Sequence, residues 1–232
     1  MKNSSSQNNL MGENKLPDFS VVRLSGMQAI KEAKKLDDKA FEGHQKISLN
    51  ELRSIADQGG LFGIIYKQKM VAEAQLLFRS TGFYNLEYES SAYCYGIAVD
   101  EKFRGKGLAH LLIARMEKEV RNNSLKTLYL ACRPENYASL KLWNSLEYKV
   151  CAYKDRYFGP DTIADTRLLL YKNISGKSTR SSLHITSLPL KNDECDIDLR
   201  NNIANLLAKH SEIIIRIKSA DKRLVYEIYK TQ

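Results

Sequence analysis

In the stretch Val99-Asp-Glu-Lys-Phe-Arg-Gly-Lys-Gly-Leu-Ala-His-Leu-Leu112, an apolar strand ends and a long amphipathic helix begins. The first backbone N–H groups of a helix have no partner inside the helix and carry partial positive charge. A bound diphosphate satisfies those groups, glycine lets the backbone approach it closely, and basic side chains add charge-assisted hydrogen bonds. The stretch therefore predicts a phosphate-binding loop that consists of Arg104, Gly105, Lys106, Gly107, Leu108 and Ala109.

The glycines of this loop fit neither of two common nucleotide motifs. A dinucleotide-binding fingerprint needs a third glycine, in G-x-G-x-x-G, and an acidic residue about 20 positions later. A Walker loop at Gly176-Lys177-Ser178 would need its first glycine where the chain has Tyr171. Taken by itself, the loop is also compatible with a solvated turn that contains glycine and basic residues.

The strand before the loop is expected to have two different faces. Alternate side chains of a strand point to opposite sides, so this strand would place large side chains on one face and small ones on the other. The large ones are Tyr93, Tyr95, Ile97 and Val99, and the small ones are Ala92, Cys94, Gly96 and Ala98. A face of small side chains predicts that a bulky group lies against it.

Hydrophobic periodicity predicts the other elements. Residues 27–41 have helical spacing, with a stripe of Ile30, Ala33, Leu36 and Ala40. A capping box, Ser48 with Glu51, opens a short helix that ends near residue 57. Further helices are expected at 107–122, 136–146 and 197–209, and strands at 19–24, 61–67, 69–78, 92–99, 127–132, 148–153, 165–171, 183–188, 213–218 and 223–229. This order predicts an α/β mixed sheet rather than a doubly wound one.

Composition divides the chain into four segments. Residues 1–16 are rich in Ser, Asn and Gln and predict a disordered lead-in. Residues 17–172 form the main domain, residues 173–182 a polar linker, and residues 183–232 a small strand-helix-strand-strand appendix. An appendix of about 50 residues buries little surface alone. We therefore expect it to dock on the main domain or on a second copy, as a dimerisation element or a substrate lid.

Bulk properties exclude some classes of protein. No apolar run reaches the roughly 20 residues that a membrane-spanning helix needs, and residues 1–14 lack the apolar core of a secretory signal, so we expect a cytoplasmic protein with no membrane partner. The cysteines form no C-x-x-C pair and have no histidine at a zinc-ligand spacing. They are Cys94, Cys132, Cys151 and Cys195. We expect no metal and no disulfide framework.

The net charge of +9 suggests an anionic partner, but the basic residues are spread along the chain. Residues 173–232 carry 10 basic and 7 acidic residues, a net charge of +3, which leaves most of the excess outside the appendix. No run of five like charges occurs. We therefore expect a solvated basic surface that attracts a polyanionic cofactor, and no nucleic-acid partner.

Three motifs resemble those of a known family. Arg104-x-x-Gly107-x-Ala109, after a strand that ends in Ile-Ala-Val, is similar to the signature of the GNAT superfamily of N-acetyltransferases. Residues 133–148 resemble its second cofactor segment, R-x-x-N-x-x-A-x-x-L-Y-x-x-L-G-F, and residues 155–161 resemble its aromatic loop between the last two strands. The resemblance runs from about residue 19 to residue 171. It is closest in character to the branch that acetylates ribosomal proteins and protein N-termini.

The resemblance implies the GNAT fold, in which helices cover both faces of a mostly antiparallel mixed sheet and strands 4 and 5 splay apart. It implies acetyl-coenzyme A (acetyl-CoA) as co-substrate, with its pantetheine arm hydrogen-bonded to the backbone of Ile97, Ala98 and Val99. Asn136 would contact the same region, although it also suits a helix cap. The implied enzyme is an acyl-CoA-dependent N-acyltransferase, in which a neutral primary amine attacks the thioester directly in a ternary complex.

At two catalytic positions the chain departs from the family pattern. Many members have a tyrosine as general acid where this chain has Trp143, and indole cannot fill that role. Relatives that acetylate protein N-termini often have a Glu or His base where this chain has Ala131. Two hypotheses follow. Either other residues supply the acid and the base, or the chain is a GNAT-like module that binds acyl-CoA without turnover.

Three residues are candidates to compensate. Tyr93 matches a tyrosine that acts through water in some N-terminal acetyltransferases, although an aromatic residue in a strand is also ordinary core. Glu73 interrupts the apolar run Val71-Ala72-Glu73-Ala74 and is a candidate base with a raised pKa, or else a solvent-facing residue. Tyr157 is a candidate to hold the acceptor's backbone, or else it covers a loop.

The sequence leaves the acceptor open. A protein N-terminus, a lysine and a small amine all satisfy the implied chemistry. We expect the selectivity to lie in the loops at residues 79–91 and 154–164.

Overall fold

The computed structural model describes residues 19–41, 46–154, 156–157, 166–176, 182–189, 197–210, 213–220 and 223–231. The predicted lead-in at residues 1–16 lies outside the described residues, as does the larger part of the aromatic loop that precedes residue 166.

The elements follow the predicted order. Along the chain they are β1 (Val21–Arg23), α1 (Met27–Ala40), α2 (Leu49–Asp57), β2 (Leu61–Tyr66), β3 (Lys69–Leu77), β4 (Ser91–Val99), the 3₁₀ turn η2 (Glu101–Phe103), α3 (Leu108–Asn122), β5 (Thr127–Cys132), α4 (Tyr137–Ser145), β6 (Lys149–Lys154), β7 (Arg167–Asn173), β8 (Ser182–Pro189), α5 (Ile197–Lys209), β9 (Ile213–Ala220) and β10 (Arg223–Thr231). Only η2 was not predicted.

Local sequence signals explain several of these boundaries. The Ser48 hydroxyl accepts a hydrogen bond from the Glu51 amide, and the Glu51 carboxylate accepts one from the Ser48 amide, so the predicted capping box is confirmed. Lys67 and Gln68 both have positive φ angles, 48° and 62°. Such a pair of left-handed residues makes the tight hairpin turn that was predicted between β2 and β3.

The ten strands form one mixed sheet in the order β1-β2-β3-β4-β5-β7-β6-β9-β10-β8. Among the described strands, β4 and β5 are the parallel pair and the other neighbours are antiparallel. The parallel ladder joins residues 91–94 to residues 127–130 and ends there, although β4 continues to residue 99 and β5 to residue 132. The two strands therefore separate in the middle of the sheet, as the resemblance implied.

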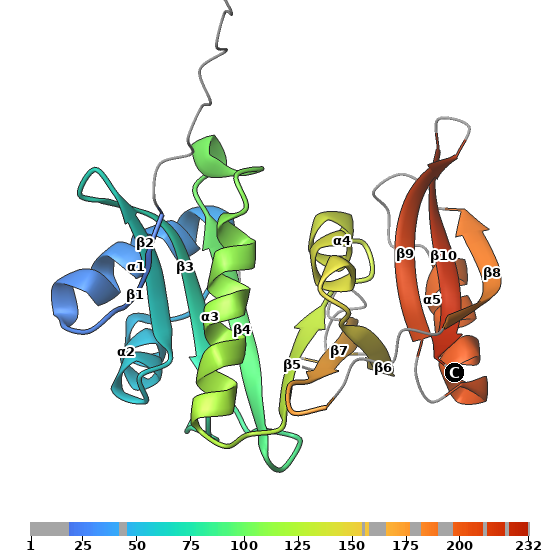
Figure 1. The fold of residues 1–232 in the computed structure, drawn as a ribbon, viewed down its shortest axis with the longest axis horizontal. Helices are drawn as coiled ribbons and strands as arrows, with labels where there is room; N and C mark the ends of the chain where they lie inside the picture. The colour runs from blue at the N-terminus through green and yellow to red at the C-terminus, as the bar shows by residue number, and fades with distance from the viewer. Residues whose placement is uncertain are drawn as a thin grey trace, which may run out of the picture.

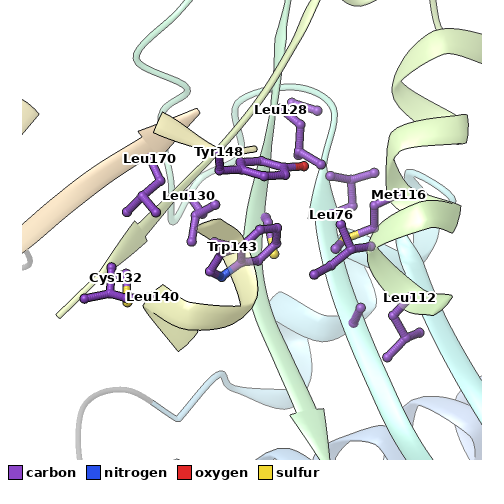
Figure 2. Packing of buried hydrophobic residues seen from close by; sticks show 14 of the residues in the cluster. Leu76, Leu112, Met116, Leu128, Leu130, Cys132, Leu140, Trp143, Tyr148 and Leu170 are labelled. Atoms are coloured by element: carbon purple, nitrogen blue, oxygen red, sulfur yellow. The ribbon is translucent and has the colours of Figure 1, made fainter. Parts of the chain in front are cut away.

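Helices cover both faces of the sheet. Figure 1 shows α3 lying over β4 on one face, with α1 and α2 on the other side of the sheet. Figure 2 shows Leu112 and Met116 of α3 beside Leu76 of β3, and Trp143 of α4 close to Tyr148. The rings of Trp143 and Tyr148 are 4.7 Å apart, edge to face. These contacts form a core that continues from α3 to α4 and fixes both helices against the strands that separate.

A β-bulge corrects the expected pattern of β4. Gln75 of β3 pairs with Gly96 and Leu76 pairs with Cys94, which leaves Tyr95 as an extra residue. A bulge shifts the alternation of side chains by one position. Tyr93 and Tyr95 therefore pack on the α1 side, whereas Ile97 and Val99 pack into the core on the α3 side. The prediction that these four share one face, opposite a face of only small side chains, was wrong.

The C-terminal strands extend the sheet of their own chain. Ile213 of β9 pairs with Val150 of β6, and Ile203, Ile215 and Ile228 belong to the same hydrophobic core as α3 and α4. Figure 1 shows β9, β10 and β8 beyond α4, with α5 beside them. The expected role of the appendix, as a dimerisation element or a substrate lid, stays a prediction. Within the part of the chain that the structure describes, no helix has both the length and the apolarity that a membrane crossing requires.

Candidate active site

A cavity of about 510 Å³ lies where β4 and β5 separate. Side chains from both layers of helices reach it. On the α3 and α4 side the lining includes Ala109, Asn136, Ala138, Ser139, Leu142 and Trp143. On the α1 side it includes Asp37, Ala40, Phe41, Gln75, Tyr93 and Tyr95. The split thus makes one space that is accessible to groups from both faces of the sheet.

The predicted phosphate loop lies at this cavity with its backbone exposed. Gly105 and Gly107 have φ angles of 75° and 76°, in the left-handed region, and a Cβ added at either would meet no atom within 4 Å. Gly107 is the N-cap of α3. The amides of residues 108–110 form no hydrogen bond with any residue that the structure describes, as expected for the first turn of a helix. The start of α3 is therefore open to an anion.

The side chains of this loop differ in their surroundings. Arg104 lines the cavity, and its Nε donates a hydrogen bond to the Val99 carbonyl at 3.4 Å. Lys106 is exposed, and Ala109 lines the cavity. The Leu108 side chain is buried in the core, so any contact of Leu108 with an anion is restricted to its backbone amide.

The end of β4 offers unpaired backbone groups. Ile97, Ala98 and Val99 all line the cavity and pair with β3 on one edge. On the other edge the ladder with β5 has already stopped at Cys94. An unpaired strand edge presents N–H and C=O groups to whatever lies beside it. Residues 97–99 thus leave one strand edge open at the cavity, and their pairing with an extended ligand stays a prediction.

Asn136 lies at the opposite wall of the cavity, where it caps α4. Its Oδ1 accepts a hydrogen bond from the Ser139 amide at 3.1 Å. Asn136 also lines the cavity, together with Ser139 and Trp143. The helix-cap interpretation is therefore confirmed, and contact with a cofactor stays a prediction.

The structure places the three predicted catalytic residues at different depths. Tyr93 lines the cavity with 2% of its surface exposed, and its ring stacks on Tyr84 at 4.3 Å. Burial raises the pKa of the Tyr93 phenol well above its ordinary value, so this hydroxyl is neutral near pH 7. Tyr157 is outside the cavity lining, and its hydroxyl is 2.5 Å from that of Tyr84.

Glu73 lies behind the cavity wall. It is completely buried, so the interpretation as a solvent-facing residue was wrong. The Gln75 Nε2 donates to both Glu73 oxygens, at 3.1 and 3.3 Å. Burial, and then the negative charge of Asp37, raise the pKa of Glu73 well above its ordinary value.

Sequence analysis did not single out three buried polar residues that line the cavity, Asp37, Gln75 and Arg167. Asp37 is 1% exposed; its Oδ1 accepts a hydrogen bond from Gln75 Nε2 at 3.1 Å and its Oδ2 accepts one from the Ile47 amide at 3.2 Å. A signal was present, because Asp37 follows Ile30 by seven positions and Ala33 by four, which places it on the buried stripe of α1.

The two positions that depart from the family pattern also line the cavity. Trp143 is 3% exposed, and Ala131 is half-buried on the α1 side. Within the described ranges, no group of three or more His, Cys, Asp or Glu residues is arranged to hold a metal ion.

The loops expected to govern selectivity are joined to each other. Lys154 of β6 forms an ion pair with Glu87, and Tyr157 bonds to Tyr84. Glu87 and Tyr84 belong to the segment between β3 and β4, so this segment is fixed to the end of β6. Tyr84 in turn stacks on Tyr93, which lines the cavity.

Comparisons with known proteins agree with this geometry. Residues 28–148 match the model of the acetyltransferase (GNAT) family. A 62-residue stretch is 36% identical to an acetyltransferase of Pectobacterium atrosepticum and covers 27% of this chain, but only 43% of that protein's length.

Solved structures share the fold. The ribosomal-protein-S18-alanine N-acetyltransferase of Escherichia coli is 19% identical, with a TM-score of 0.54 over 70% of this chain and 98% of that one. A chain of the NatC complex bound to Gag peptide and CoA is 16% identical, with a TM-score of 0.56 over 67% of this chain and 98% of that one.

Proposed function

Since the chain belongs to the acetyltransferase (GNAT) family, we propose that it transfers the acetyl group of acetyl-CoA to a primary amine by direct attack in a ternary complex. The observation that carries the proposal is the cavity between β4 and β5, bordered by an open helix N-terminus and an unpaired strand edge. Together these features fit a molecule that has a diphosphate at one end and an extended amide-containing arm.

The residues present fit coenzyme A. The diphosphate would rest on the amides of residues 107–110 and on Arg104 and Lys106, because anions are stabilised at a helix N-terminus. The open space in front of Gly105 and Gly107 leaves room for it. The pantetheine amides would pair with the backbone of residues 97–99, and Asn136 would contact the arm from α4. When bound, acetyl-CoA supplies an activated thioester carbonyl.

The acceptor amine must arrive as a free base beside that carbonyl. Tyr93 is a neutral phenol that lines the cavity, and we propose that it donates a hydrogen bond where negative charge develops. Glu73 and Tyr157 are outside the cavity lining, although Glu73 is bonded to Gln75, which lines the cavity. Their roles as base and as acceptor clamp stay predictions.

We propose a protein N-terminus or a lysine as the first acceptor class to test. The NatC structure, which has this fold, was solved with a peptide and CoA. A small amine is the second acceptor class. The module that binds acyl-CoA without turnover remains the alternative of a different kind, because Trp143 and Ala131 line the cavity where relatives have an acid and a base.

Calorimetry and thiol release test the proposal together. CoA should bind to the folded protein, and free thiol should appear when acetyl-CoA is mixed with at least one member of a panel of unblocked peptides, lysine peptides and polyamines. Absence of CoA binding by folded protein would contradict the site itself. CoA binding with no thiol release for any acceptor would favour the module.

A further inference from the structure

We propose that Asp37 is the catalytic residue that binds the acceptor's ammonium group and takes its proton, on the α1 side of the cavity. The inference rests on the proposed acetyl transfer. It names a base that is not at the family's usual positions, and it defines the acceptor as a cationic amine.

The direction of approach follows from the two walls of the cavity. The features that fit CoA lie on the phosphate loop, on the edge of β4 and on α4. An attacking amine needs the space that CoA leaves, and that space is bordered on the α1 side by Asp37, Phe41 and Tyr95. Ala131, which packs on the same side, has a small side chain and leaves this part of the cavity open.

Hydrogen bonds fix the Asp37 carboxylate and a neighbouring acceptor oxygen. Gln75 Nε2 donates to Asp37 at 3.1 Å and to Glu73 at 3.1 Å, so both amide hydrogens of Gln75 are used. The Gln75 Oε1 then faces Gly96 of β4, where an added Cβ would lie 3.1 Å from it. Gly96 also lines the cavity. An ammonium there would find two acceptors, the Asp37 carboxylate and the Gln75 carbonyl oxygen.

The charge of this group is unbalanced. None of the ion pairs among the described residues involves Asp37 or Glu73. Lys34, one turn earlier in α1, is paired with Asp38. Arg104, Arg133 and Arg167 also line the cavity, but none of them forms an ion pair with Asp37. Buried charges in proteins are normally paired, so the Asp37 carboxylate is available to a cationic ligand on the α1 side.

Two titratable neighbours of Asp37, Glu73 and Tyr95, favour their neutral forms, which leaves Asp37 as the negatively charged group of the three. Glu73 is fully buried beside it and has a pKa raised well above the ordinary value, which favours its protonated form. Burial, and then the charges of Glu51 and Asp37, raise the pKa of Tyr95 to about 12, which keeps its phenol neutral. Burial also raises the pKa of Asp37, which moves this carboxylate toward the range in which a general base works best.

The step balances in atoms and charge. The ammonium gives one proton to Asp37, and the nitrogen lone pair then forms the new C–N bond with the acetyl carbon while the C–S bond breaks. A second proton leaves the nitrogen and ends on the departing sulfur, so the products are an N-acetyl amide and CoA thiol. Asp37 releases the first proton to solvent and is ready for the next cycle.

The variant Asp37→Asn tests the inference directly. It removes the base but keeps the shape of the side chain and an oxygen for the Ile47 amide. With the unblocked peptide that wild type acetylates fastest, we expect kcat/KM for the peptide to fall about 100-fold or more, in the range usual for loss of a general base. The Kd for CoA should stay within about two-fold. Asp38→Asn is the matched control, because Asp38 is the adjacent, more exposed acid of α1, and it should retain wild-type kinetics.

Each outcome has a distinct meaning. If wild type binds CoA but acetylates no peptide or amine of the panel, the proposed function fails and this role fails with it. If wild type is active and folded Asp37→Asn retains kcat/KM within about three-fold, only this inference fails. An equal loss of CoA binding and activity in Asp37→Asn would also overturn it, because a structural role would then explain both.

A second measurement uses wild type alone, in case Asp37→Asn does not fold. Peptides with Lys, Gln or Glu after the N-terminal residue place a charge close to the reacting amine. A buried carboxylate should favour Lys and disfavour Glu, by about five- to ten-fold between the extremes, because like charges at a desolvated site repel. Preference for Glu would overturn the inference.

Discussion

The two halves of the cavity are built by different means. The cofactor half consists mainly of backbone groups from one contiguous segment, residues 97–110, with two left-handed glycines and an open strand edge, and α4 adds the side chain of Asn136. The acceptor half consists of side chains from α1, β3 and β4, and Asp37 is 38 residues from its partner Gln75. Backbone-built sites depend on local chain geometry, whereas side-chain sites depend on tertiary packing. Substitutions should therefore separate cofactor binding from acceptor chemistry.

The largest effect outside Asp37 is expected for Gly107→Val. A β-branched residue is strained at a φ angle of 76°, and its side chain would fill the open space in front of the helix amides. Loss of one charge-assisted hydrogen bond to a phosphate corresponds to about 2 kcal/mol, so calorimetry should show CoA binding weakened roughly 30-fold.

Gly26→Val is the control for backbone strain. Gly26 is the N-cap of α1, has a φ angle of 81°, and has nothing within 4 Å of an added Cβ. Both variants should lose stability, Gly26→Val the more because ψ is 149° at Gly26 and 7° at Gly107, but Gly26→Val should bind CoA like wild type. Equal CoA affinity in the two variants would mean that α3 does not hold the diphosphate.

The same contrast between local and tertiary features explains which parts of the structure could be predicted from the sequence. The elements and the phosphate loop could be predicted because periodicity, caps and glycine spacing are local signals. The bulge at Tyr95 could not, because it arises from the register between β3 and β4. Asp37 was missed because the buried face of α1 was defined by its apolar residues, among them Leu36 and Ala40. Its contact with Gln75 shows that Asp37 is buried at the cavity.

Trp143→Tyr should change catalysis with little change in CoA affinity. Trp143 lines the cavity where many family members have a tyrosine acid. A phenol there can protonate the departing sulfur, so we expect kcat to rise about five-fold, a modest part of what acid catalysis can give. The smaller ring should lower stability by about 1–2 kcal/mol, because Trp143 is 3% exposed and packs on Tyr148.

Trp143→Phe provides the comparison, because it makes a similar loss of packing without a hydroxyl. It should show the same fall in melting temperature and no gain in kcat. If both variants have the same kcat, residue 143 does not supply a proton to the sulfur, and the acid must come from elsewhere in the cavity.

Glu73→Gln should have a smaller effect on catalysis and a pH-dependent effect on stability. A neutral partner of Asp37 can be replaced by an amide of the same shape, so kcat/KM should stay within about three-fold, whereas loss of a direct base would lower it about 100-fold. A 100-fold loss of kcat/KM in Glu73→Gln would indicate that Glu73 itself is the base.

The stability effect follows from the raised pKa of Glu73. Above the ordinary pKa, the unfolded chain releases this proton while the folded chain retains it, so rising pH destabilises wild type. Glu73→Gln removes this penalty. Its melting temperature should equal that of wild type near pH 4 and exceed it by several degrees near pH 8, at about 2–4 °C for each kcal/mol. A difference that does not change with pH would mean that Glu73 is ionised in the folded protein.

The smallest effects are expected from two helix caps, one in each half of the site. Ser48 caps α2 next to Ile47, whose amide bonds to Asp37, and Asn136 caps α4 at the cofactor wall. Ser48→Ala and Asn136→Ala should each lose about 1 kcal/mol of stability.

Ser48→Ala should raise the acceptor KM about two-fold, because weakening the hydrogen bond to Asp37 by about 0.5 kcal/mol corresponds to a two-fold change in a binding constant. It should leave CoA affinity unchanged. Asn136→Ala should do the reverse, because the pantetheine would lose a contact while Asp37 keeps its partners. If either cap variant changed both constants equally, the two halves would be coupled through the sheet, and the separation of backbone-built and side-chain-built regions would not extend to their energetics.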